Sequence, residues 1–194
     1  MSIKERPILF NGLMVRAILR AILEGRKTQT RRVLKDTWCP GIERHPYLTN
    51  HPERAAIECP YGQPGDRLWV RETWATEEHE GKVVYRATDE GHFPIVDGKW
   101  KPSIHMPRWA SRILLEIVSV RVERLQDISE EDAKSEGVRW DGEYWRGGTH
   151  PIKKTDQCWS TVSDAFKALW KAINGPGSWD ANPWVWVIEF KRIA

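Results

Sequence analysis

The chain has 194 residues, which suits one domain, and its 30 Lys and Arg against 27 Asp and Glu leave a net charge of only +3. This net charge is too small to indicate nucleic-acid binding through bulk electrostatics, so any basic site has to be local. The sequence has no apolar run of about 18 residues and no secretory signal at its start, which predicts a cytoplasmic protein that does not enter a membrane.

The three cysteines, Cys39, Cys59 and Cys158, form no C-x-x-C pair, which fits a reducing compartment better than a disulfide framework. His45 and His51 lie near the first two cysteines, so a zinc site is conceivable. The spacing of these four residues is looser than in known zinc sites. We therefore expect no metal and no cofactor.

The first part of the chain predicts a strand, a helix and a second strand. Residues 7–10 (PILF) are the strand, and Asn11 can cap the helix that follows. The apolar residues of this helix share one face: Val15, Ile18, Leu19, Ile22 and Leu23. Gly25 can end the helix in a left-handed conformation, and residues 28–33 then alternate as an extended strand.

The middle of the chain alternates between strands and irregular sequence. Residues 35–64 are rich in Pro and Gly and are typical of a long loop or insertion. A Pro-Gly-Asp turn then leads into a strand over residues 67–74, and residues 82–87 form another. Gly and Pro recur from residue 89 to residue 107, which predicts a further irregular segment.

Residues 112–125 predict the longest strand, with a bulge near Val118 where the apolar pattern changes face. Ser129 caps a short helix that Gly137 ends, which places Glu136 in the last helical turn.

Residues 138–160 are polar and rich in Gly and Trp, which predicts a loop. The next helix spans residues 162–173, and its inward face consists of Ala165, Phe166, Leu169, Trp170 and Ile173. Residues 182–193 close the chain as a strand. Short helices and more numerous strands indicate an α+β domain built as a small mixed β-barrel, with the helices at its mouth.

Four segments resemble, in this order, the ASCH domain family of the PUA-like superfamily: ILEGRKTQTRR, PGDRLWVRE, LQDISEEDAKSEGV and WVIEFKRI. The resemblance covers about half of the chain. It implies a single PUA-like barrel over residues 1–194 with insertions at about 35–64, 75–110 and 138–160. The remaining segments look like those of longer ASCH proteins, which prophages often encode.

The resemblance also implies an activity, because some small ASCH proteins are amidohydrolases that deacetylate 4-acetylcytidine. Their lysine and threonine lie in a G-x-K-T-x-T motif, and their glutamate lies in the short later helix. Carried over to this chain, these residues are Lys27, Thr30 and Glu136, which we expect to be catalytic. The small amidohydrolases lack the long insertions of this chain, which can close the pocket or change its substrate.

Amide hydrolysis requires a nucleophile, a base, an acid for the leaving amine and donors for the oxyanion. Thr30 can supply the hydroxyl, while either Lys27 or Glu136 can act as the base. Residues three apart on a regular strand face opposite sides, so Lys27 and Thr30 reach one cleft only if Lys27 precedes the strand. If the strand begins earlier, Thr28 becomes the neighbour of Thr30 instead.

Several other side chains are candidates for binding a modified nucleoside or RNA: Arg26, Arg31, Arg32, Arg71 and Trp74. Arg71 can pair with a phosphate or form a structural ion pair, and Trp74 can stack on a base or pack in the core. The sequence thus supports two hypotheses. One is a metal-independent hydrolase of an acylated nucleoside, and the other is a non-catalytic module that binds RNA or a nucleotide.

Overall fold

The computed structural model describes residues 3–10, 15–34, 51, 54, 57–89, 98–146 and 158–194. The predicted Asn11 cap, Cys39, His45 and most of the insertion at 35–64 lie outside these residues. Parts of the other two insertions lie outside them as well.

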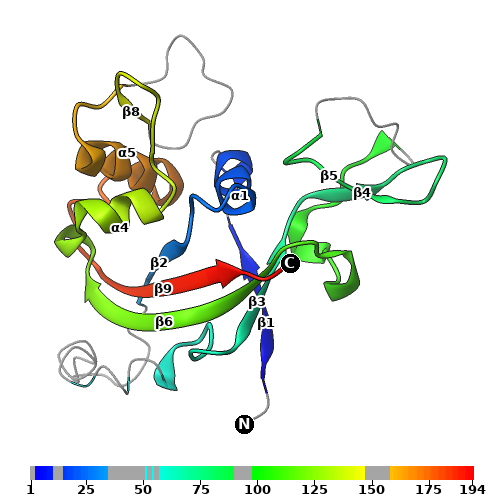
Figure 1. Ribbon diagram of the computed structural model, residues 1–194, viewed down its shortest axis with the longest axis horizontal. Helices are drawn as coiled ribbons and strands as arrows, with labels where there is room; N and C mark the ends of the chain where they lie inside the picture. The colour runs from blue at the N-terminus through cyan, green and yellow to red at the C-terminus, as the bar shows by residue number, and fades with distance from the viewer. Residues whose placement is uncertain are drawn as a thin grey trace.

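The elements of the described residues are arranged around one curved sheet (Figure 1). The strands are β1 (Glu5–Leu9), β2 (Gln29–Val33), β3 (Arg67–Arg71), β4 (Trp74–Thr76), β5 (Val83–Tyr85), β6 (Leu114–Arg124), β7 (Arg139–Trp140), β8 (Trp145–Arg146) and β9 (Trp184–Arg192). The helices are α1 (Val15–Leu23), α4 (Glu130–Ser135) and α5 (Val162–Asn174), with short 3₁₀ turns η2 (Ser103–His105), η3 (Arg108–Ala110) and η4 (Leu125–Asp127).

The main sheet has five strands in the order β1-β3-β6-β9-β2. The β1–β3 pair is parallel, and the other three pairs are antiparallel. The α+β class is confirmed, but the prediction of a closed barrel is wrong as far as hydrogen bonding is concerned. Among the described residues no backbone ladder joins β1 to β2, and the side chain of Arg32 crosses from β2 to donate to the carbonyl of Leu9.

The long strand β6 contains the predicted bulge. Its register against β9 shifts between Ile117 and Ser119, and the intervening Val118 is exposed. An extra residue lets the strand bend, so β6 and β9 curve together along their length (Figure 1).

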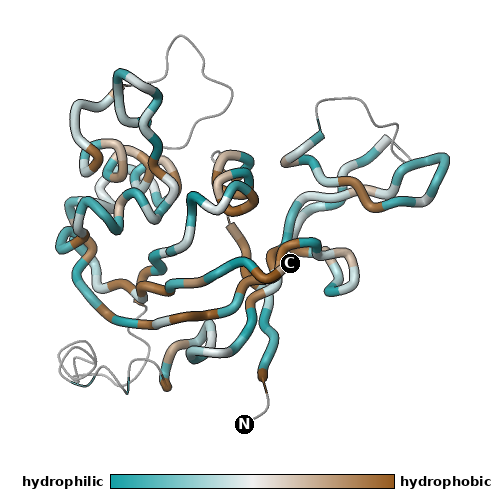
Figure 2. The backbone as a smooth tube through the Cα atoms, in the orientation of Figure 1, coloured by the Kyte–Doolittle hydropathy of each residue, from teal (hydrophilic) through white to brown (hydrophobic). Residues whose placement is uncertain are grey.

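Strand β9 is buried on both faces, and each face belongs to a different core cluster. Trp186 and Ile188 pack on one face with α1, whose buried residues are Ile18, Leu19, Ala21 and Ile22. Val185 and Val187 pack on the other face against α5. The brown colour along much of β9 in Figure 2 reflects this run of apolar residues. No helix in the described part of the chain is long and apolar enough to cross a membrane.

Two element boundaries differ from the sequence predictions. The strand expected over residues 67–74 is divided into β3 and β4 at residues 72 and 73, where Glu72 is buried in an ion pair with Arg112. The loop expected over residues 138–160 contains the short hairpin of β7 and β8, which is stabilised by packing between Trp140 and Trp145.

Candidate functional site

Lys27 lies in the turn between α1 and β2, as the sequence predicted. Gly25 adopts a left-handed φ of 73°, and the backbone N–H groups of Arg26 and Lys27 both donate to the carbonyl of Ala21. These bonds satisfy the carbonyls at the end of α1 and turn the chain. Strand β2 begins only at Gln29, so the side chain of Lys27 is free of the alternation that fixes the strand residues.

Glu136 directly follows α4, one position later than predicted, and caps that helix. Ser129 begins α4 by accepting a hydrogen bond from the backbone N–H of Asp132, which confirms the predicted cap. Lys27 Nζ donates to the Glu136 carboxylate at 2.6 Å and to its backbone carbonyl at 2.9 Å. Both side chains are buried, with exposed fractions of 4% and 6%.

Gly137 allows this close approach of α1 and α4. Its φ is 96°, and a Cβ atom at this position would lie 3.3 Å from the Cβ atoms of both Ala21 and Lys27. A side chain here would be strained by the backbone conformation and would press on Lys27. The glycine that the sequence indicated as a helix stop therefore also positions the amine.

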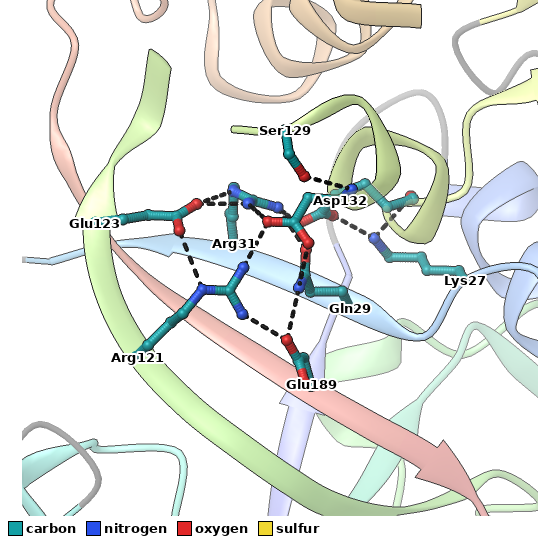
Figure 3. Close-up of polar contacts among 9 residues, drawn as sticks. Lys27, Gln29, Arg31, Arg121, Glu123, Ser129, Asp132 and Glu189 are labelled. Carbon is teal, nitrogen blue, oxygen red and sulfur yellow. Dashed lines mark hydrogen bonds and ion pairs between the residues drawn. The ribbon is translucent and has the colours of Figure 1, made fainter. Parts of the chain in front are cut away.

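Arg31 connects the carboxylate of Glu136 to a larger group of charges (Figure 3). Its guanidinium donates to Glu136 at 3.1 Å, to Asp132 at 2.8 Å and to Glu123 at 3.0 Å. The Arg31 side chain is fully buried. Since three carboxylates already occupy this side chain, it contributes to the position of Glu136 rather than to the surface of the pocket.

Arg121 forms the outer part of the same group of charges. It pairs with Glu123, Asp132 and Glu189, and these side chains are partly exposed (Figure 3). Opposite charges lower the pKa of Asp132 even though its partial burial acts in the other direction. Asp132 is thus held in its charged form.

A pocket of about 440 Å³ lies beside the Lys27–Glu136 pair, within the range of sizes that bind small ligands. Its lining consists of Phe10, Ile18, Lys27, Thr30, Arg31, Arg32, Val33, Tyr61, Glu136, Phe166, Leu169, Trp170, Ile173 and Asn174. Lys27, Thr30 and Glu136 therefore share one pocket. Because the side chain of Arg31 has no exposed surface, Arg31 lines this pocket through its main chain.

The backbone groups of β2 also face this pocket. The Phe190 N–H donates to the Thr28 carbonyl, and the Leu34 N–H donates to the Trp184 carbonyl. In an antiparallel pair, alternate residues make these bonds, so the even-numbered residues of β2 bond to β9. The main-chain groups of Arg31 consequently point away from β9, towards the open edge.

Burial is the largest influence on the pKa of Lys27 and lowers it from its usual value near 10.5. The nearby carboxylate of Glu136 acts in the opposite direction, while Arg32 and Arg31 lower the pKa further. Removal from water disfavours an ammonium, and two neighbouring cations add to this effect. The amine therefore loses its proton more readily than an exposed lysine does.

The other predicted ligand-binding residues lie in different places. Arg26 is exposed and pairs with Glu24, outside the pocket. Arg71 lies over the ring of Trp69, and Trp74 is buried beside Met106 and Ala110. Arg71 is the last residue of β3, and Trp74 begins β4, whose pairing with β5 forms a lobe away from α5 in Figure 1. Of the five predicted binding residues, only Arg31 and Arg32 line the pocket with Lys27.

Three lining residues whose side chains can form hydrogen bonds were not expected at a site from the sequence. Tyr61 follows the Cys-Pro sequence of an irregular segment, which carries no recognisable signal. Trp170 and Asn174 lie one turn apart on α5, and the apolar pattern of that helix predicted only a core position for Trp170. Their role depends on where α5 packs, which the periodicity of the helix does not specify.

The described residues contain no group of three or more His, Cys, Asp or Glu side chains placed to hold a metal ion. Cys59 is buried and unpaired, and Cys158 is exposed. Cys39 and His45, two of the four residues considered for a zinc site, lie outside the described part of the chain.

No protein-family profile matches the sequence, and no curated protein matches it either. Among solved structures, the chain is similar to a high-resolution crystal structure of an ASCH domain from Lactobacillus crispatus JV V101. The two share 14% sequence identity with a TM-score of 0.40, over 98% of this chain and 79% of the other. That structure is of the family that the four sequence segments resemble.

Proposed function

We propose that the protein is an ASCH-type hydrolase of PUA-like architecture that removes an acyl group from a modified nucleoside such as 4-acetylcytidine. The observation that carries this proposal is the buried 2.6 Å contact between Lys27 Nζ and Glu136 Oε2, in a pocket that Thr30 also lines. An amine and a hydroxyl in one small pocket are the groups that nucleophilic amide hydrolysis requires.

In this reaction Thr30 Oγ1 adds to the acyl carbonyl carbon while its proton passes to the neutral amine of Lys27. The carbon–nitrogen bond then breaks, and the Lys27 ammonium returns the proton to the departing nitrogen of the base. Water hydrolyses the Thr30 ester by the same proton route, which releases the carboxylic acid and restores the hydroxyl. Glu136 is the positioning residue that holds the amine.

The lowered pKa of Lys27 supports this assignment of roles. A lysine at its ordinary pKa of about 10.4 is almost entirely protonated at neutral pH and cannot accept a proton. Burial increases the neutral fraction, whereas the contact with Glu136 keeps the amine in place. The substrate class itself comes from the sequence resemblance.

The test is acetate release from 4-acetylcytidine by the purified protein. Lys27→Met removes the amine but retains the apolar stem, and we expect it to lower the rate by about 10² to 10⁴, the usual contribution of a general base. Lys134→Met is the matched control, because Lys134 is an exposed lysine on α4. No turnover by the unmodified protein, or equal rates for it and Lys27→Met, would refute the proposal.

A nucleic-acid-binding module is the second candidate, and one surface favours it. Trp109 is 71% exposed and lies edge-on against Trp74, with ring centroids 5.7 Å apart. Lys101 lies over the other ring, and Arg108 is adjacent in sequence. Exposed aromatic rings among basic side chains are typical of proteins that bind single-stranded nucleic acid.

Trp109→Ala separates the two candidates because Trp109 is outside the pocket. If the protein binds single-stranded RNA through this surface, the substitution weakens binding by about 1–3 kcal/mol for one stacked base and leaves acetate release unchanged. Trp140→Ala is the control, since Trp140 is 51% exposed on a different hairpin. RNA affinity that is equal in all three proteins would eliminate this surface as the binding site.

A further inference from the structure

Arg32 differs from the other two cations that line the pocket. Lys27 is paired with Glu136, and the Arg31 side chain is occupied by three carboxylates. Arg32 donates to the backbone carbonyl of Leu9 at 2.6 Å, and no carboxylate of the described residues lies within ion-pair distance of it. Among the described residues its direct contacts are therefore a carbonyl dipole and neighbouring aromatic rings, while the charge of Glu136 acts on it from beyond ion-pair distance.

Those rings belong to Phe10 and Tyr61, whose centroids are 5.1 Å and 6.0 Å from the guanidinium carbon of Arg32. Burial is also the main reason that the pKa of Arg32 is lowered. Moving a cation out of water is costly unless it is paired and hydrogen-bonded, and contacts with rings offset only part of this cost. The Nε–H group of Arg32 is buried and donates to no described residue.

A second side chain that lines the pocket has a donor of the same kind. Trp170 of α5 lines the pocket and is only 4% exposed, and its indole Nε1 is buried without a hydrogen-bond partner among the described residues. Buried N–H groups in folded proteins are almost always paired. Both donors therefore belong to side chains that line one pocket, and each lacks an acceptor that a ligand can supply.

The guanidinium requires more than a neutral acceptor, because it carries a positive charge that no carboxylate of the described residues pairs with directly. Its planar fork of N–H groups matches the oxygens of a phosphate. Thr30 and Arg32 are two residues apart on one face of β2, so their Cα atoms are separated by about 7 Å. A nucleoside bound with its base at Thr30 would extend its sugar and phosphate along this direction.

We propose that the pocket binds a phosphorylated nucleoside, with the phosphate at Arg32 and an oxygen of the ligand at Trp170 Nε1. This inference rests on the proposed function for the placement of the base beside Thr30. The phosphate can belong to a free nucleotide or to the backbone of RNA, because both present the same oxygens to the guanidinium.

Isothermal titration with three probes tests the proposal: cytidine, cytidine 5′-monophosphate and a short oligocytidylate. We expect the monophosphate to bind roughly 10- to 100-fold more tightly than cytidine at low salt, as one charge-assisted contact provides. Arg32→Gln should remove this preference, whereas the exposed Arg26→Gln should retain it. Tighter binding of the oligonucleotide than of the monophosphate would identify RNA as the source of the phosphate. Tighter binding of the monophosphate would identify a free nucleotide.

Equal affinities of the unmodified protein for cytidine, its monophosphate and the oligonucleotide would overturn the proposal. Retention of the preference in Arg32→Gln would also overturn it. If the loss of the contact with Leu9 prevents Arg32→Gln from folding, Arg32→Lys retains a cation but not the fork, and it should lose part of the preference. Trp170→Phe, which removes the indole N–H but retains a ring, should weaken binding of the monophosphate.

The titration tests the phosphate site independently of the proposed hydrolysis. A protein that prefers the monophosphate but releases no acetate from 4-acetylcytidine retains the phosphate site and loses the hydrolase assignment. A protein that releases acetate but binds all three probes equally retains the activity and loses the phosphate site.

Discussion

Replacing Glu136 with Gln removes one negative charge from the buried pair with Lys27 and changes little else in shape. The two side chains are 4% and 6% exposed, so water does not replace the lost charge. Arg31 retains Glu123 and Asp132 as partners after the substitution. The cost of the substitution therefore falls mainly on the ammonium of Lys27.

The magnitude is limited by the free energy of removing the proton from that ammonium. At pH 7, neutralising an amine of ordinary pKa about 10.4 costs about 4.6 kcal/mol, which is 3.4 pH units at about 1.36 kcal/mol each. Breaking a buried ion pair on one side typically costs about 3–5 kcal/mol. We therefore expect Glu136→Gln to reduce the free energy of unfolding by about 3–5 kcal/mol at pH 7.

The cost should decrease as the pH rises. In the Glu136→Gln variant, the pKa of Lys27 in the folded state falls further below its value in the unfolded chain, so the unfolded state binds the proton more tightly. Between these two pKa values, raising the pH favours the folded form. At pH 9 the cost of neutralisation is only about 1.9 kcal/mol, from 1.4 pH units. The same rise in pH increases the free energy of unfolding of the unmodified protein less, because its Glu136 raises the pKa of Lys27.

Urea denaturation of the unmodified protein and of Glu136→Gln, at pH 7 and at pH 9, measures the loss in free energy of unfolding at each pH. The control is Glu116→Gln, since Glu116 pairs with Lys191 at the surface, where the side chains are 30% and 59% exposed. A surface pair contributes about 0–1 kcal/mol, and neither side chain should show this pH dependence. If Glu136→Gln costs less than about 1 kcal/mol at pH 7, or costs the same at both pH values, the reasoning about a desolvated ammonium is wrong.

Three further predictions concern the same contacts. Gly137→Ala should lower the free energy of unfolding by about 1–3 kcal/mol and reduce acetate release, because its Cβ would press on Ala21 and Lys27; wild-type stability and activity would contradict this. Arg112→Met should lower the free energy of unfolding by about 3–5 kcal/mol, because it leaves the fully buried carboxylate of Glu72 unpaired. The rate of acetate release per folded molecule should be unchanged when the folded fraction is taken from the denaturation curve. Acetate release should rise with pH through the lowered pKa of Lys27 and level off below pH 10.5, so a rate that falls over this range would exclude the amine as the base.

The sequence by itself determined the local features that position the reactive groups. The apolar pattern of α1 and the glycine after it predicted that Lys27 precedes β2, and the structure confirms this because the end of a helix depends on nearby residues. The Ser129 cap and the bulge at Val118 were also predictable, since each leaves its signal within a few residues.

Only the tertiary structure decided what each side of β2 faces. Alternation along the strand separates Arg31 from Arg32, but it does not specify which of them meets the carboxylates of α4 and β6. The opening between β1 and β2 and the arrival of Trp170 in the pocket likewise depend on contacts between segments far apart in the chain. Local periodicity fixes the face of an element on which a residue lies, whereas long-range packing fixes the group that it meets there.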